Sequence, residues 1–119
     1  MEALTIAKEI ESKIEELELL KVELPKAIYA QGKASANYDK QLALTIVKLR
    51  AGAEIEFEGR MVKDPPVTIL ERIAKGICYK EALDMDTAEG KLKSIDSAIK
   101  VTMAQLNGFQ SINRYLAEV

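Results

Sequence analysis

Few side chains in this sequence could act as catalysts. The chain contains no histidine and a single cysteine, Cys78. Without histidine, no imidazole can activate a serine or cysteine nucleophile, and the most common general base and transition-metal ligand is missing. Cys78 cannot form an internal disulfide, and we predict that it packs in the protein interior. The residue types therefore predict a protein that is not an enzyme and has no catalytic residues.

Carboxylates are the remaining side chains that could do chemistry. Glu81 and Asp84 are three residues apart, as are Glu15 and Glu18, so each pair would share one face of a helix and could hold magnesium. All-α nucleotide pyrophosphohydrolases bind magnesium with pairs of this kind. Here the two pairs are far apart in the sequence and would lie at different heights in two antiparallel helices. A magnesium-dependent nucleotide hydrolase is therefore the least favoured alternative, and we predict no metal and no cofactor.

A row of lysines suggests a different kind of site. Lys26, Lys33 and Lys40 recur every seven residues, which places them along one side of a helix. Such a row could follow a phosphate backbone while Tyr29 stacks on a base. The net charge of the chain is −2, however, and a solvated helix face explains three lysines more simply. Binding of single-stranded nucleic acid through these four residues is kept as an alternative.

The elements that must position these residues are helices. The 119-residue chain is 48% hydrophobic but only 5% aromatic and has no tryptophan. A core of leucine, isoleucine and alanine is typical of packed helices, and the length fits one domain. The first residues alternate charged and apolar side chains, so we expect no signal peptide. No apolar run approaches the ~20 residues that a membrane span needs. Because the single cysteine also fits a reducing compartment, we expect one cytoplasmic all-α domain that does not enter a membrane.

Two long helices are predicted because apolar residues recur in steps of three and four. The first covers about residues 4–50, and Pro25 should kink it or break it briefly. The second covers about residues 68–117 and should begin with a capping box formed by Thr68 and Glu71. Since the connection is short, the two helices must run antiparallel as a helical hairpin.

The connection, residues 51–67, has a different pattern. Charged and apolar residues alternate over 54–57, the dipeptide Glu58-Gly59 can form a turn, and Arg-Met-Val-Lys follows at 60–63. This pattern predicts a small β-hairpin with Ile55 and Val62 on the same side. A two-stranded hairpin is marginally stable by itself. It should therefore lean on the helices or on a partner.

Both predicted helices carry apolar residues on the side that faces away from their shared seam. In a helical hairpin that is complete alone, these reverse faces should be charged. The second helix also places glycines there, each costing about 1 kcal/mol relative to alanine, and small residues let another helix approach closely. No third long helix exists to cover both faces, so we predict a homo-oligomer that forms a multi-helix bundle. The predicted oligomer interface consists of Gly76, Tyr79, Leu83, Gly90, Val101, Gly108 and Ile112.

Contacts with another partner are predicted at two places. Phe57 and Arg60 lie in the β-hairpin expected in the connection. Arg114 and Tyr115 lie at the polar end of the second helix, where they could meet a partner or an anion. We predict these four residues to bind the partner.

Several features together resemble a class of small helical-hairpin proteins encoded by phages and prophages. They are the long first helix, the Gly-containing turn region, the helix start Pro-Pro-x-Thr-x-x-Glu at 65–71, and the closing Leu-Asn-Gly-Phe-Gln-Ser-Ile-Asn-Arg-Tyr-Leu at 106–116. The resemblance spans most of the chain and includes no catalytic motif. It implies a place in the host cytoplasm, among recombination and replication proteins or among inhibitors of host defence.

The leading prediction is thus an oligomeric helical binding protein that acts by protein–protein interaction or sequestration. Its expected partners are other copies of itself and an unidentified host or phage protein. The alternative is a single-stranded nucleic-acid accessory protein in phage recombination or replication, which would use the lysine row.

Overall fold

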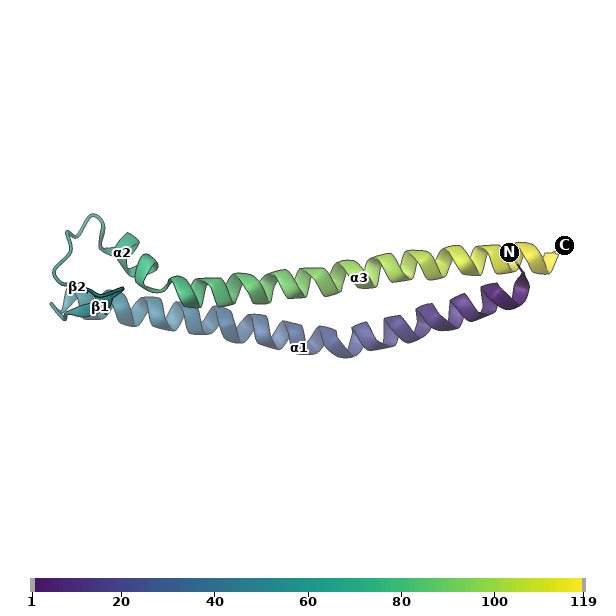
Figure 1. Ribbon diagram of the computed structural model, residues 1–119, viewed down its shortest axis with the longest axis horizontal. Coiled ribbons are helices and arrows are strands. Elements are labelled where there is room, and N and C mark those ends of the chain that lie inside the picture. Colours follow the sequence, from purple (N-terminus) through teal and green to yellow (C-terminus); the bar gives the residue numbers. More distant parts are fainter. Residues whose placement is uncertain (1, 119) are drawn as a thin grey trace. The chain divides into compact units, whose positions relative to one another are not determined.

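The computed structural model describes residues 2–118, which form three helices and one two-stranded sheet (Figure 1). The elements are α1 (Ala3–Arg50), β1 (Ile55–Phe57), β2 (Arg60–Val62), α2 (Leu70–Ile77) and α3 (Tyr79–Glu118). The chain is mostly helical, and two long antiparallel helices with a small β-hairpin between them confirm the predicted helical hairpin. Within the described residues, no helix is both long and apolar enough to cross a membrane.

The chain divides into two compact units. The two-helix unit contains the start of α1, up to Tyr29, and the end of α3, from Gly90. The connector unit contains residues 30–89, which are the rest of α1, the β-hairpin, α2 and the start of α3. Within each unit the α1 segment runs antiparallel to the α3 segment (Figure 1).

The first helix is continuous through Pro25. A short break at this proline, one of the two predicted outcomes, is therefore wrong, whereas a kink stays a prediction. Proline removes one backbone donor, but helical residues continue on both sides of it, so propagation of the helix outweighs one missing hydrogen bond.

A glycine cap ends α1. Gly52 has a φ of +81°, which is the left-handed conformation that favours glycine. The Gly52 N–H donates to the carbonyl of Leu49 at 3.2 Å, and the Ala53 N–H donates to the carbonyl of Lys48 at 3.0 Å. These two bonds form a Schellman motif, which satisfies carbonyls at the end of the helix and turns the chain towards β1.

The β-hairpin has the predicted turn and register. Ile55 pairs with Val62 across the antiparallel strands, and both are half-buried. Glu58 and Gly59 have φ values of 51° and 76°, so both central residues of the turn are left-handed, as a type I′ hairpin requires. These features confirm the predicted hairpin, and its residues Ile55 and Val62 pack against the buried side chains Leu49, Leu70 and Ala74.

The start of the second helical region differs from the prediction in two respects. No capping box forms, because Ile69 is the N-cap residue of α2 and no side chain caps it. The Ile69 N–H instead donates to the carbonyl of Pro66 at 3.0 Å, so a turn leads into the helix one residue beyond Thr68. The predicted single helix over 68–117 is also interrupted at Cys78, where φ is −88° and ψ is 25°.

The interruption at Cys78 coincides with a contact to α1. The Cys78 side chain is buried, as predicted, and its Sγ lies 3.4 Å from the Thr45 Oγ1 of α1. Thr45 Oγ1 also donates to the carbonyl of Gln41 at 2.8 Å. Gly76 weakens helix propagation just before the break. These contacts therefore hold the point where α2 ends and α3 begins.

The connector unit has a hydrophobic core. Leu49 is 2% exposed, and with Leu70 and Ala74 it forms a buried cluster between α1 and α2. Six half-buried apolar residues surround this cluster: Leu42, Ile46, Ile55, Val62, Ile73 and Ile77. They come from α1, both strands and α2, so this core has three layers of side chains rather than two.

The two-helix unit has a seam instead of a core. Its buried residues are Ile6, Ala27 and Thr102. Most other side chains in the seam are half-buried, including Leu17, Leu24, Leu92, Ile95, Ile99, Leu106 and Phe109. Two helices alone cannot enclose side chains of this size.

Candidate functional site

The face of α3 that points away from the seam is the principal candidate site. We call its part in the two-helix unit the outer α3 face. It carries no charged side chain, and all its residues are exposed: Gly90, Ser94, Ser97, Val101, Ala104, Gly108, Ile112 and Tyr115. Val101 is 56% exposed and Tyr115 is 67% exposed. The predicted interface residues Gly90, Val101, Gly108 and Ile112 therefore lie together and uncovered on one face.

The helical glycines of this face have no close neighbour within the chain. A Cβ atom added to Gly90 or Gly108 would meet no atom within 4 Å among the described residues. Glycine destabilises a helix interior, and here no contact inside the chain requires it. The open space above these glycines is available to another molecule.

The remaining predicted interface residues belong to the connector unit. Gly76 lies in α2 near its end, and Tyr79 and Leu83 lie in the first turns of α3. Leu83 is exposed, as is Gly76. The Tyr79 ring already has an intramolecular neighbour, the Phe57 ring of β1, at 5.9 Å in an edge-to-face arrangement. Tyr79 thus helps to hold the β-hairpin against α3, in addition to any contact between subunits.

The start of α1 also presents apolar side chains to solvent. Leu4, Leu19, Val22 and Tyr29 belong to the two-helix unit and are all exposed. Leu19 is 69% exposed. The prediction that both helices are apolar on their reverse faces agrees with these exposures.

The four predicted partner-binding residues do not form one site within either unit. Phe57 and Arg60 are paired across the hairpin in the connector unit, where Phe57 is half-buried and Arg60 is exposed. Arg114 and Tyr115 are exposed in the two-helix unit, and the Arg114 guanidinium donates a long hydrogen bond of 3.5 Å to Ser111 Oγ. Phe57 contributes to a cavity of about 350 Å³ beside Tyr79.

The lysines of the nucleic-acid alternative are exposed. Lys26 is partly neutralised, since its Nζ lies 3.5 Å from Glu23 Oε1. Lys33 and Lys40 are exposed in the connector unit, and Tyr29 is exposed at the end of the α1 segment of the two-helix unit. No feature of the described residues joins them into a groove, so nucleic-acid binding stays a prediction.

The carboxylate pairs are divided between the units. Glu15 and Glu18 belong to the two-helix unit, and Glu81 and Asp84 belong to the connector unit. Among residues 2–118, no three cysteine or carboxylate side chains cluster closely enough to hold a metal ion. The magnesium-dependent alternative therefore gains no support from the arrangement of these residues.

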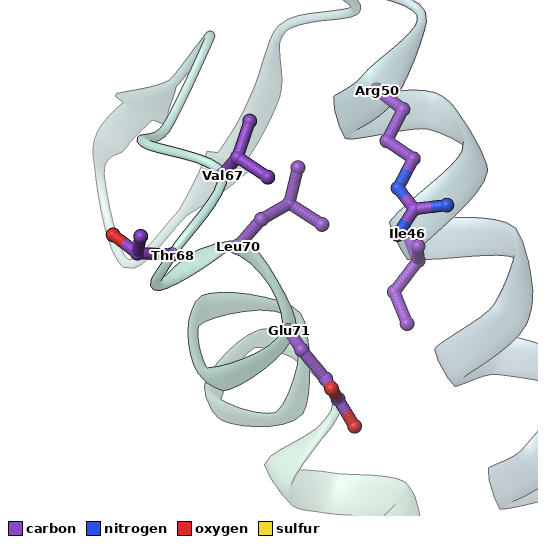
Figure 2. Close-up of a pocket in the computed structure, with 6 residues that line it drawn as sticks. All are labelled: Ile46, Arg50, Val67, Thr68, Leu70 and Glu71. Atoms are coloured by element: carbon purple, nitrogen blue, oxygen red, sulfur yellow. The ribbon is translucent and has the colours of Figure 1, made fainter.

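A cavity that the sequence did not predict lies where α1 ends and α2 begins. It measures about 320 Å³ and is lined by Ile46, Arg50, Val67, Thr68, Leu70 and Glu71. Val67 and Leu70 point from the loop and the start of α2 towards α1 (Figure 2). Its residues come from two separated stretches of sequence, and three of them are polar or charged: Arg50, Thr68 and Glu71. Apolar and polar side chains therefore share the lining of this cavity.

Comparisons with known proteins give no relative for this arrangement. No protein-family model matches the chain, and no curated protein and no solved structure was found to be similar to it. The resemblance to phage-encoded helical-hairpin proteins therefore stays a prediction from the residues quoted for it.

Proposed function

We propose that the protein is a non-enzymatic, oligomeric helical binding protein that acts by protein–protein interaction or sequestration. The observation that carries this proposal is the exposure of apolar side chains on the reverse faces of both helices in the two-helix unit. Contiguous exposed apolar surface on a folded protein marks an interaction site. We place the protein in the host cytoplasm, as a phage-encoded inhibitor of host defence, on the resemblance given above.

The energetics favour association. Burying one large apolar side chain contributes about 1.5–3 kcal/mol, and the two-helix unit leaves Leu19, Val22, Val101, Ile112 and Tyr115 exposed. Association of several copies would cover these residues and form the proposed multi-helix bundle. A protein partner fits this surface better than a nucleic acid does, because the outer α3 face has no charge with which to bind phosphates.

Self-association is tested by light scattering and sedimentation at micromolar concentrations. The wild-type protein is expected to form an oligomer, and Val101→Lys should shift it towards monomer because a buried lysine has no partner in the interface. The matched control is Gln110→Lys, which adds the same charge at an exposed position outside the outer α3 face. A wild-type protein that stays monomeric at these concentrations contradicts the proposal.

Partner binding and catalysis need separate tests. Purified complexes from cells that express the wild-type protein should contain a second protein, and this partner should be retained by Gln110→Lys.

Turnover of nucleoside triphosphates with magnesium is expected to be absent. Turnover that is lost in Glu81→Gln and Asp84→Asn would instead establish the hydrolase alternative.

A further inference from the structure

The side of α1 that faces away from its buried residues changes its charge along the helix. We call it the outer α1 face and define it as the exposed positions that recur every three or four residues from Leu4 to Val47. Its acidic residues lie in the two-helix unit, and beyond Tyr29 its charged residues are lysines of the connector unit. They are Glu11, Glu15 and Glu18 in the first unit and Lys33 and Lys40 in the second. Since α1 is one continuous helix, its periodicity alone places both groups on one face.

These five side chains lack a charged partner. Within residues 2–118, none of them forms an ion pair. Glu15 is also one helical turn away from both Glu11 and Glu18, and like charges at this spacing destabilise a helix. A partner that presents lysines to the acidic half of the face and carboxylates to the basic half would remove this repulsion.

A second copy of the chain presents its charges in that order. In an antiparallel pair with a two-fold axis between residues 25 and 26, Glu11 of one copy lies opposite Lys40 of the other. Glu18 lies opposite Lys33 in the same way. Because the two-fold axis repeats each contact, the same opposite charges meet on both sides of the axis. The outer α1 face is therefore complementary in charge to itself.

The apolar residues of the face match in the same register. Val22 lies opposite Tyr29, and Leu4 lies opposite Val47. All four side chains are more than half exposed in the chain, so pairing would remove apolar surface from water. Apolar residues thus meet apolar residues in the register that also matches the charges.

Other arrangements of two α1 helices match less well. A parallel pair would set each of these charges against the same charge of the second copy. An antiparallel pair shifted by one heptad would set Leu4 against Lys40 or, for a shift in the other direction, Glu11 against Val47. Among these arrangements, only the axis between residues 25 and 26 matches both the charges and the apolar residues.

The other charged positions of the face permit this pair. Lys8 and Glu15 lie opposite alanine residues of the second copy. Lys26 borders the axis, and its Nζ lies 3.5 Å from Glu23 Oε1 of the same helix. The two copies of Lys26 can therefore approach each other with their charges partly neutralised.

We propose that the outer α1 face binds the same face of a second copy as an antiparallel pair, with the two-fold axis between residues 25 and 26. This inference rests on the proposed self-association and names one surface that takes part in it. Exposed ion pairs each contribute little, so the contact should add to association through α3 and be too weak to hold the Val101→Lys variant together. A nucleic acid fits this face less well, because its acidic half repels phosphates.

Charge reversal tests which residues face each other. Glu11→Lys should weaken association about tenfold, because two lysines then face each other on both sides of the axis. Adding Lys40→Glu should restore the wild-type association constant, since opposite charges meet again. The matched control adds Lys33→Glu instead, which gives the same net charge but leaves like charges opposite each other at both contacts. Sedimentation at low ionic strength, where screening is weakest, measures the association constants.

Three results of this experiment would overturn the proposed pair. Restoration by Lys33→Glu and not by Lys40→Glu would indicate a register shifted by one heptad. Equal association constants for the two double variants would mean that these charges do not meet a second copy. Association unchanged in every variant, with loss of binding to a single-stranded oligonucleotide when either lysine is replaced, would assign the face to nucleic acid.

Disulfide cross-linking tests the same register without changing any charge. All variants carry Cys78→Ala, so that the introduced thiol is the only one in the chain. A mixture of Val22→Cys and Tyr29→Cys should give a cross-linked dimer under mild oxidation, because the two positions lie opposite each other. Each variant alone should stay uncross-linked, since residues 22 of the two copies are separated by two helical turns.

The cross-links also separate this inference from the proposed function. Val22→Cys that cross-links with itself would indicate a parallel or shifted pair and overturn the register. An oligomeric wild-type protein whose mixed variants give no cross-link would refute the α1 pair while leaving self-association intact. A monomeric wild-type protein would refute the proposed function as well.

Discussion

The connector unit and the two-helix unit are built from the same two helices but bury their apolar residues differently. In the connector unit, α2 and the β-hairpin add a third layer over α1, so that Leu49, Leu70 and Ala74 are buried. In the two-helix unit no element of the described chain covers the outer sides of α1 and α3, and Leu19 and Val101 remain exposed. A pair of amphipathic helices therefore leaves apolar side chains exposed unless a third layer covers them. The connector unit contains such a layer, and we propose that the two-helix unit obtains one by association.

The two units should differ most in how much stability they lose when a leucine is replaced by alanine. Leu49→Ala in the connector unit should lower the free energy of unfolding by about 2–5 kcal/mol, because it leaves a cavity in a packed core. Leu19→Ala in the two-helix unit should change the stability of the monomer by less than about 0.5 kcal/mol. Denaturant unfolding of both variants in the monomeric Val101→Lys background measures this. Equal losses would mean that the two units do not differ in packing.

Replacing a glycine by alanine should also change the stability differently in the two units. Gly59→Ala should cost about 1–2 kcal/mol, because alanine is strained at the left-handed φ of the hairpin turn. Gly90→Ala in the monomeric background should instead stabilise α3 by up to about 1 kcal/mol. Thermal unfolding of the two variants should therefore shift in opposite directions. A destabilised Gly90→Ala monomer would show that a contact within the chain requires glycine at this position.

A smaller effect is expected from the two buried threonines. Thr45→Val should cost about 1 kcal/mol, because the hydroxyl that contacts Gln41 and Cys78 is lost. Within the described residues Thr102 makes no side-chain hydrogen bond, so Thr102→Val should be neutral or slightly stabilising. Equilibrium unfolding by urea resolves the two variants. If Thr102→Val lowered the free energy of unfolding more than Thr45→Val, the stabilising polar contact would lie in the two-helix unit and not in the connector unit.

Much of the fold could be predicted from the sequence because it depends on local patterns. Apolar spacing gave α1 to within one residue at its start, and Glu58-Gly59 gave the turn and register of the hairpin. The predicted capping box does not form, because a turn that begins at Pro66 places the start of the helix beyond Thr68. The interruption at Cys78 coincides with a contact to Thr45, which lies far away in the sequence and which local patterns do not reveal.

The candidate site could be predicted in part for the same reason. Exposure of the outer α3 face follows from helical periodicity, which needs only the sequence of one helix. The cavity beside Arg50 could not be predicted, because residues from the end of α1 and the start of α2 line it together. Local pattern therefore identifies faces of single helices, whereas cavities require knowledge of how elements pack.

The central claim is that the two-helix unit completes its packing by association, whereas the connector unit is complete within one chain. Hydrogen exchange at a low and a high protein concentration tests this most directly, because protection follows local stability. Peptides from residues 90–118 should become more protected at the higher concentration, and peptides from residues 42–49 and 70–77 should not change. Protection of residues 90–118 that is independent of concentration, in a protein that is monomeric throughout, would contradict the claim.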